Sequence, residues 1–201
     1  ALKTLGIKNI KVKKIPNILF FSTGNEITNQ EKIPDWKVRN SNSHYIQSLN
    51  KNFLFNFING GILKDKDKLI FEKQIKKMLN SKIDIIITSG AVSAGKFDYV
   101  PSVVKKFNIE GYFKGVDIRP GKPILFAKIK RKQKAIFGLP GNPISSAGCF
   151  RFFVYPYLLD LLGVEEEKPF KAILKNEFKK KLNFTRFVKS KINTTKNGKV
   201  E

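Results

Sequence analysis

Two carboxylates and three glycine-containing loops are the parts of this sequence best suited to chemistry. The loops are STGNE (22–26), TSGAVSAGKFD (88–98) and LPGNPISS (139–146), and each follows a run of apolar residues. Glycine lets backbone N–H groups approach a ligand closely, and such loops commonly receive anions. Glu26 and Asp98 end the first two loops. Carboxylate oxygens beside a bound phosphate are one way in which a protein shares Mg²⁺ with a nucleotide.

The third loop has the residue types of a strand-to-helix turn. Gly141 and Asn142 are expected to take unusual backbone dihedrals, and Pro143 suits a first helical position. This arrangement predicts free N–H groups at Ile144 and Ser145, which would attract an anion. A plain capped turn explains this loop better when it is taken alone. The presence of three such loops at strand ends favours a ligand site.

Simpler explanations also exist for the individual reactive side chains. Asp98 has the position of a helix N-cap, and Asp65 could cap the helix that follows it. Glu26 could be a solvated charge in a loop. His44, the single histidine, lies in a surface-like helical segment, which favours a structural role. Cys149 lies in an apolar stretch without a histidine nearby, which favours a buried thiol over a nucleophile.

Strand-like apolar runs alternate with amphipathic segments along the chain. We predict strands at 17–23, 54–58, 82–90, 124–129 and 134–139, and helices at 42–52, 67–81, 98–107 and 143–162. The second strand is expected to end at Gly60 and Gly61, the first helix to be capped by Asn42 or Ser43, and the last helix to bend at Pro156. This alternation predicts an α/β fold in three layers, with a mainly parallel sheet flanked by helices.

The chain is expected to be a fragment of a longer protein, because it begins at Ala1 and ends just after a turn-like segment. We predict a tail of a missing region at 1–15, an α/β domain at 16–164 and the beginning of a β-rich domain at 165–201. The last part is expected to form antiparallel strands around a turn at 196–198.

Composition narrows the class of protein. The formal charge of +23 favours an anionic partner, although a sequence rich in Lys, Asn, Ile and Phe also arises in an AT-rich genome. No apolar run reaches the roughly 18–20 residues of a membrane span, and one cysteine suits a reducing compartment, so we expect a soluble cytoplasmic protein. No Walker loop, GxGxxG, CxxC or Ser-His-Asp set is present, which disfavours the commonest routes of covalent catalysis.

Five motifs in order resemble the molybdopterin molybdenumtransferase family, which includes the E domain of gephyrin. They are FSTGNE, VRNSNSHYI, DIIITSGAVSAGKFDYV, IRPGKP and GLPGNPISS, and the resemblance covers residues 2–189. The resemblance implies insertion of molybdate into adenylylated molybdopterin with release of AMP and dependence on Mg²⁺ or a similar ion. It also implies a homodimer, and further domains without which this fragment would turn over poorly.

By this resemblance, Glu26 and Asp98 are expected to hold the metal, Asp65 to be a further functional carboxylate and Lys122 to lie near anionic groups. Arg119 stands where the family often has lysine. The residues expected to bind the cofactor are Thr23, Gly24, Ser89, Gly90, Ser93, Gly95, Pro140, Gly141, Asn142, Pro143 and Ser145.

Three positions depart from the family pattern, and two other functions stay open. Asn40 and Ala91 replace the usual Asp and Gly, and Lys96 places a positive charge beside the expected metal. The first alternative is a molybdopterin adenylyltransferase of the same fold, although the TGNE and LPGNP loops favour the molybdenumtransferase. The second is a basic nucleic-acid-binding module, against which neither an RNP motif nor a helix-turn-helix is visible.

Overall fold

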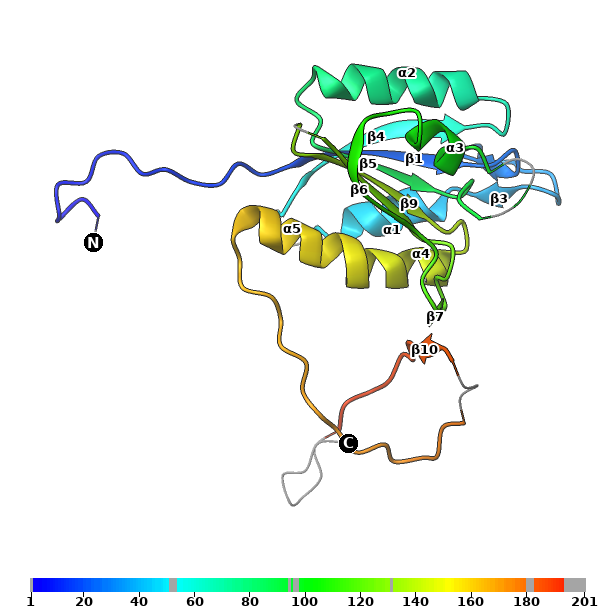
Figure 1. Ribbon diagram of the computed structural model, residues 1–201. Helices are drawn as coiled ribbons and strands as arrows, with labels where there is room; N and C mark the ends of the chain where they lie inside the picture. The colour runs from blue at the N-terminus through cyan, green and yellow to red at the C-terminus, as the bar shows by residue number, and fades with distance from the viewer. Residues whose placement is uncertain are drawn as a thin grey trace.

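A six-stranded sheet forms the centre of the protein in the computed structural model (Figure 1). The structure describes residues 2–50, 54–93, 95, 98–130, 132–179 and 183–193. In spatial order, the strands are β4 (Asn56–Leu63), β1 (Asn17–Thr23), β5 (Ile85–Ser89), β9 (Lys134–Leu139), β8 (Leu125–Ile129) and β6 (Ile109–Lys114). The first four are mutually parallel, whereas β8 runs antiparallel to β9 and β6 antiparallel to β8.

Helices cover both faces of this sheet, which confirms the predicted three-layer α/β fold (Figure 1). One layer contains α2 (Lys68–Leu79) and α3 (Val100–Val104). The other contains α1 (Ser41–Ser48), α4 (Pro143–Cys149), the π-helical turn η1 (Phe150–Val154) and α5 (Tyr155–Leu162).

The hydrophobic core has two parts, because successive side chains of the central strands point to opposite faces of the sheet. Ile85 and Ile87 of β5 pack with the α1, α4 and α5 layer, whereas Ile86 packs with the α2 and α3 layer. Successive side chains of a strand point to opposite faces, so a strand covered on both sides must be apolar throughout. All five residues of β5 are buried, and burying each isoleucine contributes about 1.5–3 kcal/mol.

Several predicted element ends are wrong. β4 runs through Gly60 and Gly61, because it still pairs with β1 beyond them, where Ile62 stands opposite Ser22. Gly60 packs against the ring of Phe21, which a Cβ atom at that position would overlap. α1 begins at Ser41, so Asn42 lies inside the helix and neither it nor Ser43 is the cap.

Two predicted caps are also wrong. α2 is preceded by Asp67, not Asp65, and α3 by Tyr99, not Asp98. The last helix begins at Pro143 as predicted, but its irregularity is the π-helical turn just before Pro156. Pro156 lacks the N–H that would bond the carbonyl of Phe152 in a regular helix, which suits a local change of hydrogen-bonding pattern.

The region after α5 differs most from the expectation. The antiparallel hairpin predicted within 165–201 does not form in the described parts of that range, and its predicted turn at 196–198 lies outside the described residues. Instead, β10 (Thr185–Arg186) pairs in parallel with β7 (Ile118–Arg119). A further short strand pair joins β2 (Ile27–Thr28) to β3 (Val38–Arg39).

The strand β6 was not predicted from the sequence. The predicted domain boundaries stay a prediction.

Glu72, Lys76 and Lys106 form a group of ion pairs that joins α2 to the turn after α3. Glu72 accepts from Lys106 Nζ at 2.5 Å and pairs with Lys76 Nζ at 2.8 Å, and its side chain is only 14% exposed. The hydrogen bond from Lys106 is the main cause that lowers the pKa of Glu72 from 4.5 to about 2.

We expect Glu72→Gln to remove a part of the acid sensitivity of the fold. Because the folded pKa lies below the unfolded value, the stabilisation from Glu72 is present above about pH 4.5 and is lost as the pH falls toward 2. Urea unfolding at a series of pH values should show a flatter acid limb for this variant. The control is Glu177→Gln, whose contact with Lys179 is 4.0 Å long and exposed. Equal acid limbs for wild type and Glu72→Gln would contradict the prediction.

Candidate functional site

The three glycine-containing loops leave the sheet at one edge. Ser22 of β1 stands opposite Ser89 of β5, and Ser89 stands opposite Leu139 of β9. Because these strands are parallel, their carboxyl ends lie level with one another, so the loops that follow are neighbours. This part of the sequence prediction is confirmed.

Hydrogen bonds fasten each loop to the strand beside it. Gly24 N–H donates to the Leu63 carbonyl at 3.0 Å, and Gly90 N–H donates to the Leu139 carbonyl at 2.8 Å. Thr23 Oγ1 donates to the Ser89 carbonyl at 3.0 Å. These hydrogen bonds fix the beginnings of the loops at this edge of the sheet. They involve four of the predicted contact residues: Thr23, Gly24, Ser89 and Gly90.

Gly90 is the glycine that the site requires most strongly. Its φ of +107° is rare for residues with a side chain, and a Cβ atom there would lie 2.7 Å from the Thr23 carbonyl oxygen. The prediction of unusual dihedrals at 141–142 is wrong. Asn142 has an ordinary extended conformation, φ −61° and ψ 126°, and a Cβ atom on Gly141 would make an ordinary contact of 3.7 Å with Gly90 Cα.

The beginning of α4 is already satisfied by a side chain. Asn142 Oδ1 accepts from the N–H groups of Ile144 at 3.1 Å and Ser145 at 3.2 Å. The predicted free N–H groups at Ile144 and Ser145 are therefore wrong, because Asn142 is a strong N-cap residue and occupies them. An anion could reach these donors only by displacing the Asn142 side chain.

Asn42 is a residue of this edge that the sequence reasoning interpreted only as a cap. Its Nδ2 donates to Ser89 Oγ at 2.6 Å and to the Gly141 carbonyl at 2.9 Å. Ser89 Oγ in turn donates to the Pro140 carbonyl at 3.3 Å. One amide thus joins α1 to the loops after β5 and β9. Its place within the VRNSNSHYI motif is the signal from which this role could have been predicted.

A cavity of about 150 Å³ lies where these loops meet. Its lining comes from β1, the β2–β3 pair, α1, the end of β5 and the beginning of α4: Ser22, Thr23, Ile27, Val38, Arg39, Asn40, Ser41, Asn42, Ser89, Gly141 and Pro143. Four of the predicted contact residues, Thr23, Ser89, Gly141 and Pro143, line it. A wider hollow of about 570 Å³, which includes His44, shares Arg39, Asn40 and Ser41 with it.

The two predicted metal-binding carboxylates each turn back onto a glycine of their own loop. Asp98 Oδ2 accepts from Ser93 Oγ at 2.6 Å and from Gly95 N–H at 2.7 Å. The Glu26 carboxylate lies against Gly24, where a Cβ atom would overlap it. Asp98 is thus a loop-closing carboxylate, and its second oxygen accepts no hydrogen bond from the described residues.

Two carboxylates are the kind of donor set that a magnesium ion completed by a substrate would use. Mg²⁺ is commonly held by one or two carboxylates together with substrate phosphates and water. Glu26 is exposed and Asp98 is half-buried, and their loops follow the neighbouring strands β1 and β5. Among the described residues, no cluster of three or more His, Cys, Asp or Glu is positioned to hold a metal. Lys96, the unusual cation of this loop, lies outside the described residues.

Asp65 connects two loops. It accepts from Asn25 Nδ2 at 2.7 Å, and its own N–H donates to Asn25 Oδ1 at 3.3 Å. This reciprocal pair holds the loop after β4 against the loop after β1. Lys64 adds a second tie, because its Nζ donates to the Ile27 carbonyl at 2.9 Å.

Basic side chains reach the same edge from the antiparallel strands. Lys122 lies in the turn before β8, whose first residue, Leu125, stands opposite Gly138 at the end of β9. Its Nζ pairs with Asp117 at 3.1 Å, and 60% of its side chain is exposed. Lys114, at the end of β6, donates to the Ser93 carbonyl at 2.8 Å, a contact that the sequence did not predict.

Cys149 is a core residue, as predicted. It is fully buried on α4, its Sγ donates to the Gly121 carbonyl at 3.4 Å, and burial raises the pKa of its thiol to about 12. His44 is exposed on α1.

The comparisons with known proteins identify the family. A family model described as a probable molybdopterin binding domain matches residues 20–160. The chain belongs to this family. None of the helices in the described part of the chain is long and apolar enough to cross a membrane.

Curated relatives and a solved structure with molybdopterin-related names support the same family. A molybdopterin molybdenumtransferase of Staphylococcus aureus is 36% identical over 98% of this chain and 47% of its own length. One from Staphylococcus epidermidis is 33% identical with the same coverage. A crystal structure of the molybdopterin biosynthesis moeA protein from Pyrococcus horikoshii OT3 matches with a TM-score of 0.68 and 28% identity over 99% of this chain and 46% of that one. The chain thus spans about half the length of the curated relatives it matches.

Gly90→Ala is expected to destabilise the fold by about 1–3 kcal/mol, because the new Cβ meets the Thr23 carbonyl in a strained conformation. Thermal or urea unfolding measures this. The matched control is Gly141→Ala in the facing loop, which is expected to change stability little. Similar losses for both variants would show that the close approach at Gly90 is not a constraint.

Proposed function

We propose that the whole protein is a molybdopterin molybdenumtransferase, which inserts molybdate into adenylylated molybdopterin with release of AMP during molybdenum cofactor biosynthesis. The observation that carries this proposal is the cavity at the sheet edge, which is lined by residues of FSTGNE, VRNSNSHYI, TSGAVS and LPGNP. Relatives that are 36% and 33% identical over 98% of the chain have this name.

In this proposal, the loops that are fastened at the edge bind the ligand. Thr23, Ser89, Gly141 and Pro143 form the cavity wall, and Asn42 keeps the second and third loops at a fixed separation. The other proposed contact residues are Gly24, Gly90, Ser93, Gly95, Pro140, Asn142 and Ser145. Rigid loops bind at lower entropic cost than mobile ones.

The acidic residues divide into two roles. Glu26 and Asp98 would hold Mg²⁺, which supplies charge neutralisation at the pyrophosphate and polarises its oxygens. Ser93 and Gly95 orient Asp98 by donating to one of its oxygens, which leaves the other oxygen to the ion. Asp65 keeps the loop of Glu26 in position through Asn25.

The basic residues attract the anionic substrates. Lys122 and Arg119 of IRPGKP stand near the beginning of β8, and Lys114 fixes the loop that contains Ser93. The formal charge of +23 adds a long-range field that favours molybdate and phosphates. We propose that the whole protein acts as a cytoplasmic homodimer, and that this half of it turns over poorly without the remainder.

AMP release by the whole protein from adenylylated molybdopterin, in the presence of molybdate and Mg²⁺, tests the proposal. Formation of adenylylated molybdopterin from a nucleotide would instead indicate an adenylyltransferase. Tight binding of random oligonucleotides at two salt concentrations, without AMP release, would indicate a nucleic-acid module.

Asp98→Asn is expected to leave folding nearly unchanged and to reduce AMP release by at least about tenfold. The amide oxygen can still accept from Ser93 and Gly95, so the loop is kept, whereas the negative charge for the ion is lost. Glu26→Gln should behave similarly. The measurement is AMP release titrated with Mg²⁺, beside thermal unfolding.

Two comparisons make this test specific. The double variant should lose much less than the product of the single losses, because both carboxylates would hold one ion. Asp160→Asn, at an exposed site on α5, which covers the other face of the sheet from α3, is the matched control (Figure 1). A wild-type rate of AMP release and an unchanged Mg²⁺ dependence in Asp98→Asn would show that Asp98 only closes its loop and does not bind the ion.

A further inference from the structure

A segment beyond the matched domain lies against the IRPGKP motif. β10 pairs with β7, and the pair is extended by hydrogen bonds from Thr185 N–H to the Asp117 carbonyl at 2.9 Å and from Phe187 N–H to the Arg119 carbonyl at 3.0 Å. The family match ends at residue 160, so 184–187 lie outside it. Figure 1 shows β10 beside β7 below the α4 end of the molecule.

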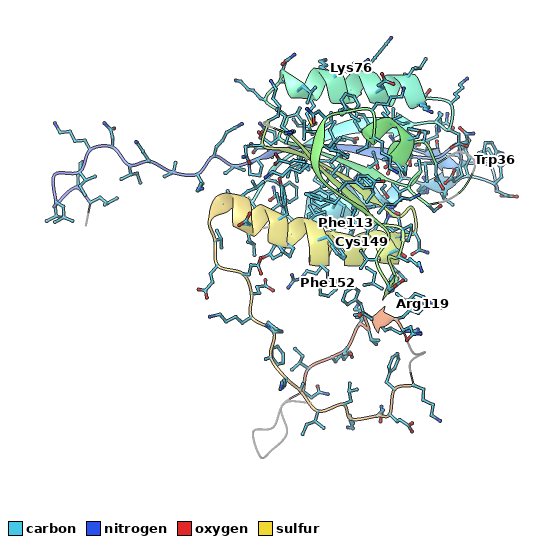
Figure 2. All side chains as sticks on the ribbon, in the orientation of Figure 1. Trp36, Lys76, Phe113, Arg119, Cys149 and Phe152 are labelled. Atoms are coloured by element: carbon cyan, nitrogen blue, oxygen red, sulfur yellow. The ribbon has the colours of Figure 1, made fainter. Side chains whose placement is uncertain are left out.

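Two aromatic rings anchor this segment. The Phe187 ring stacks on Phe152 of η1, with centroids 3.9 Å apart and planes inclined by 11°. At the other end of the segment, Lys122 Nζ lies 5.1 Å from the centroid of Phe184. Figure 2 shows Phe152 and Arg119 on the side of the domain that β10 meets. The first ring joins the segment to the helical layer, and the second faces a residue of the proposed site.

The Lys122 ammonium is held by two groups from this pair of strands. Asp117, just before β7, accepts from it at 3.1 Å, but the Asp117 side chain is 72% exposed. Such an exposed ion pair is weak and screened by salt. The ring of Phe184 adds an attraction that fixes the direction of the flexible lysine and depends less on salt.

We propose that Phe184 is a positioning residue for Lys122, so that the segment after the molybdopterin-binding domain completes the basic wall of the site. The inference rests on the proposed function, in which Lys122 attracts an anionic substrate. It assigns to 184–187 a part in substrate affinity that the matched domain does not contain.

The test uses the whole protein with Phe184→Leu, Phe184→Tyr and the matched control Phe178→Leu. Phe178 is another ring after α5 that faces a cation, with Arg186 at 5.4 Å. The first readout is the NMR shift of the Lys122 Cε protons, which the Phe184 ring current displaces. The second is KM for molybdate in AMP release, measured beside kcat.

We expect Phe184→Leu to abolish the ring-current shift and to raise KM for molybdate by about two- to fivefold with kcat nearly unchanged, which is the loss expected for a cation–π contact. Phe184→Tyr should restore both values, and Phe178→Leu should change neither. In a Lys122→Met background, Phe184→Leu should have no further effect on KM. If Phe184→Leu unfolds the protein, Phe184→Met, whose unbranched side chain adapts more readily to the space left by the ring, replaces it.

Two results would overturn the inference and leave the proposed function standing. One is an unchanged KM in Phe184→Leu while the ring-current shift is lost. The other is a full additional loss in the Lys122→Met background, which would make the effect of Phe184 independent of Lys122. Absence of AMP release by the wild-type protein would overturn the proposed function itself, and an unperturbed Lys122 shift in the wild type would overturn the contact.

Discussion

The level ending of β1, β5 and β9 is the constraint on which the rest of the structure depends. Their parallel register places Thr23, Gly90 and Pro140 side by side, and only then can Gly90 N–H reach the Leu139 carbonyl and Thr23 Oγ1 the Ser89 carbonyl. These bonds satisfy backbone groups that would otherwise be buried without partners. The residues that begin these loops therefore extend the hydrogen bonding of the sheet.

The core and the site are connected by this register. Ile85, Ile86 and Ile87 belong alternately to the two hydrophobic clusters. A shift of β5 by one residue would move all three to the wrong face, so this packing also fixes the position of Ser89 at the end of the strand. Two residues later, Ser89 meets Asn42 and Pro140. The shape of the cavity thus depends on packing that lies several residues away from it.

The sequence was sufficient for the parts of this structure that local patterns determine. Continuous apolar runs identified β1, β5, β8 and β9 because buried strands need them, and glycine identified the loop after β5 because only glycine allows the approach at Gly90. The partially exposed β6 carries no such run, and its burial alternates only weakly. It was therefore missed.

Other features depend on contacts between distant segments. Asn42 and Ser89 are 47 residues apart, and the residues that pair β10 with β7, Thr185 and Ile118, are even farther apart in the sequence, so neither pairing has a local signal. The beginning of α4 was predicted wrongly for a different reason: Asn142 was expected to take unusual backbone dihedrals and to leave N–H groups free, although its backbone is extended and its side chain caps the helix. One residue type supports both interpretations, and only the backbone conformation separates them.

The reversal of direction at β8 has a consequence for how this fold tolerates change. Because β8 alone runs against the other strands of the sheet, the connection before β8 and the end of β6 reach the edge that carries the cavity, whereas the connection from Ile129 to Lys134 turns at the opposite edge. The sheet thereby separates two kinds of connection. Insertions between β8 and β9 would lengthen a loop remote from the cavity, whereas a change of one residue before β8 would displace Lys122. Variation in loop length within such a protein is accordingly expected to accumulate at one edge and to be excluded from the other.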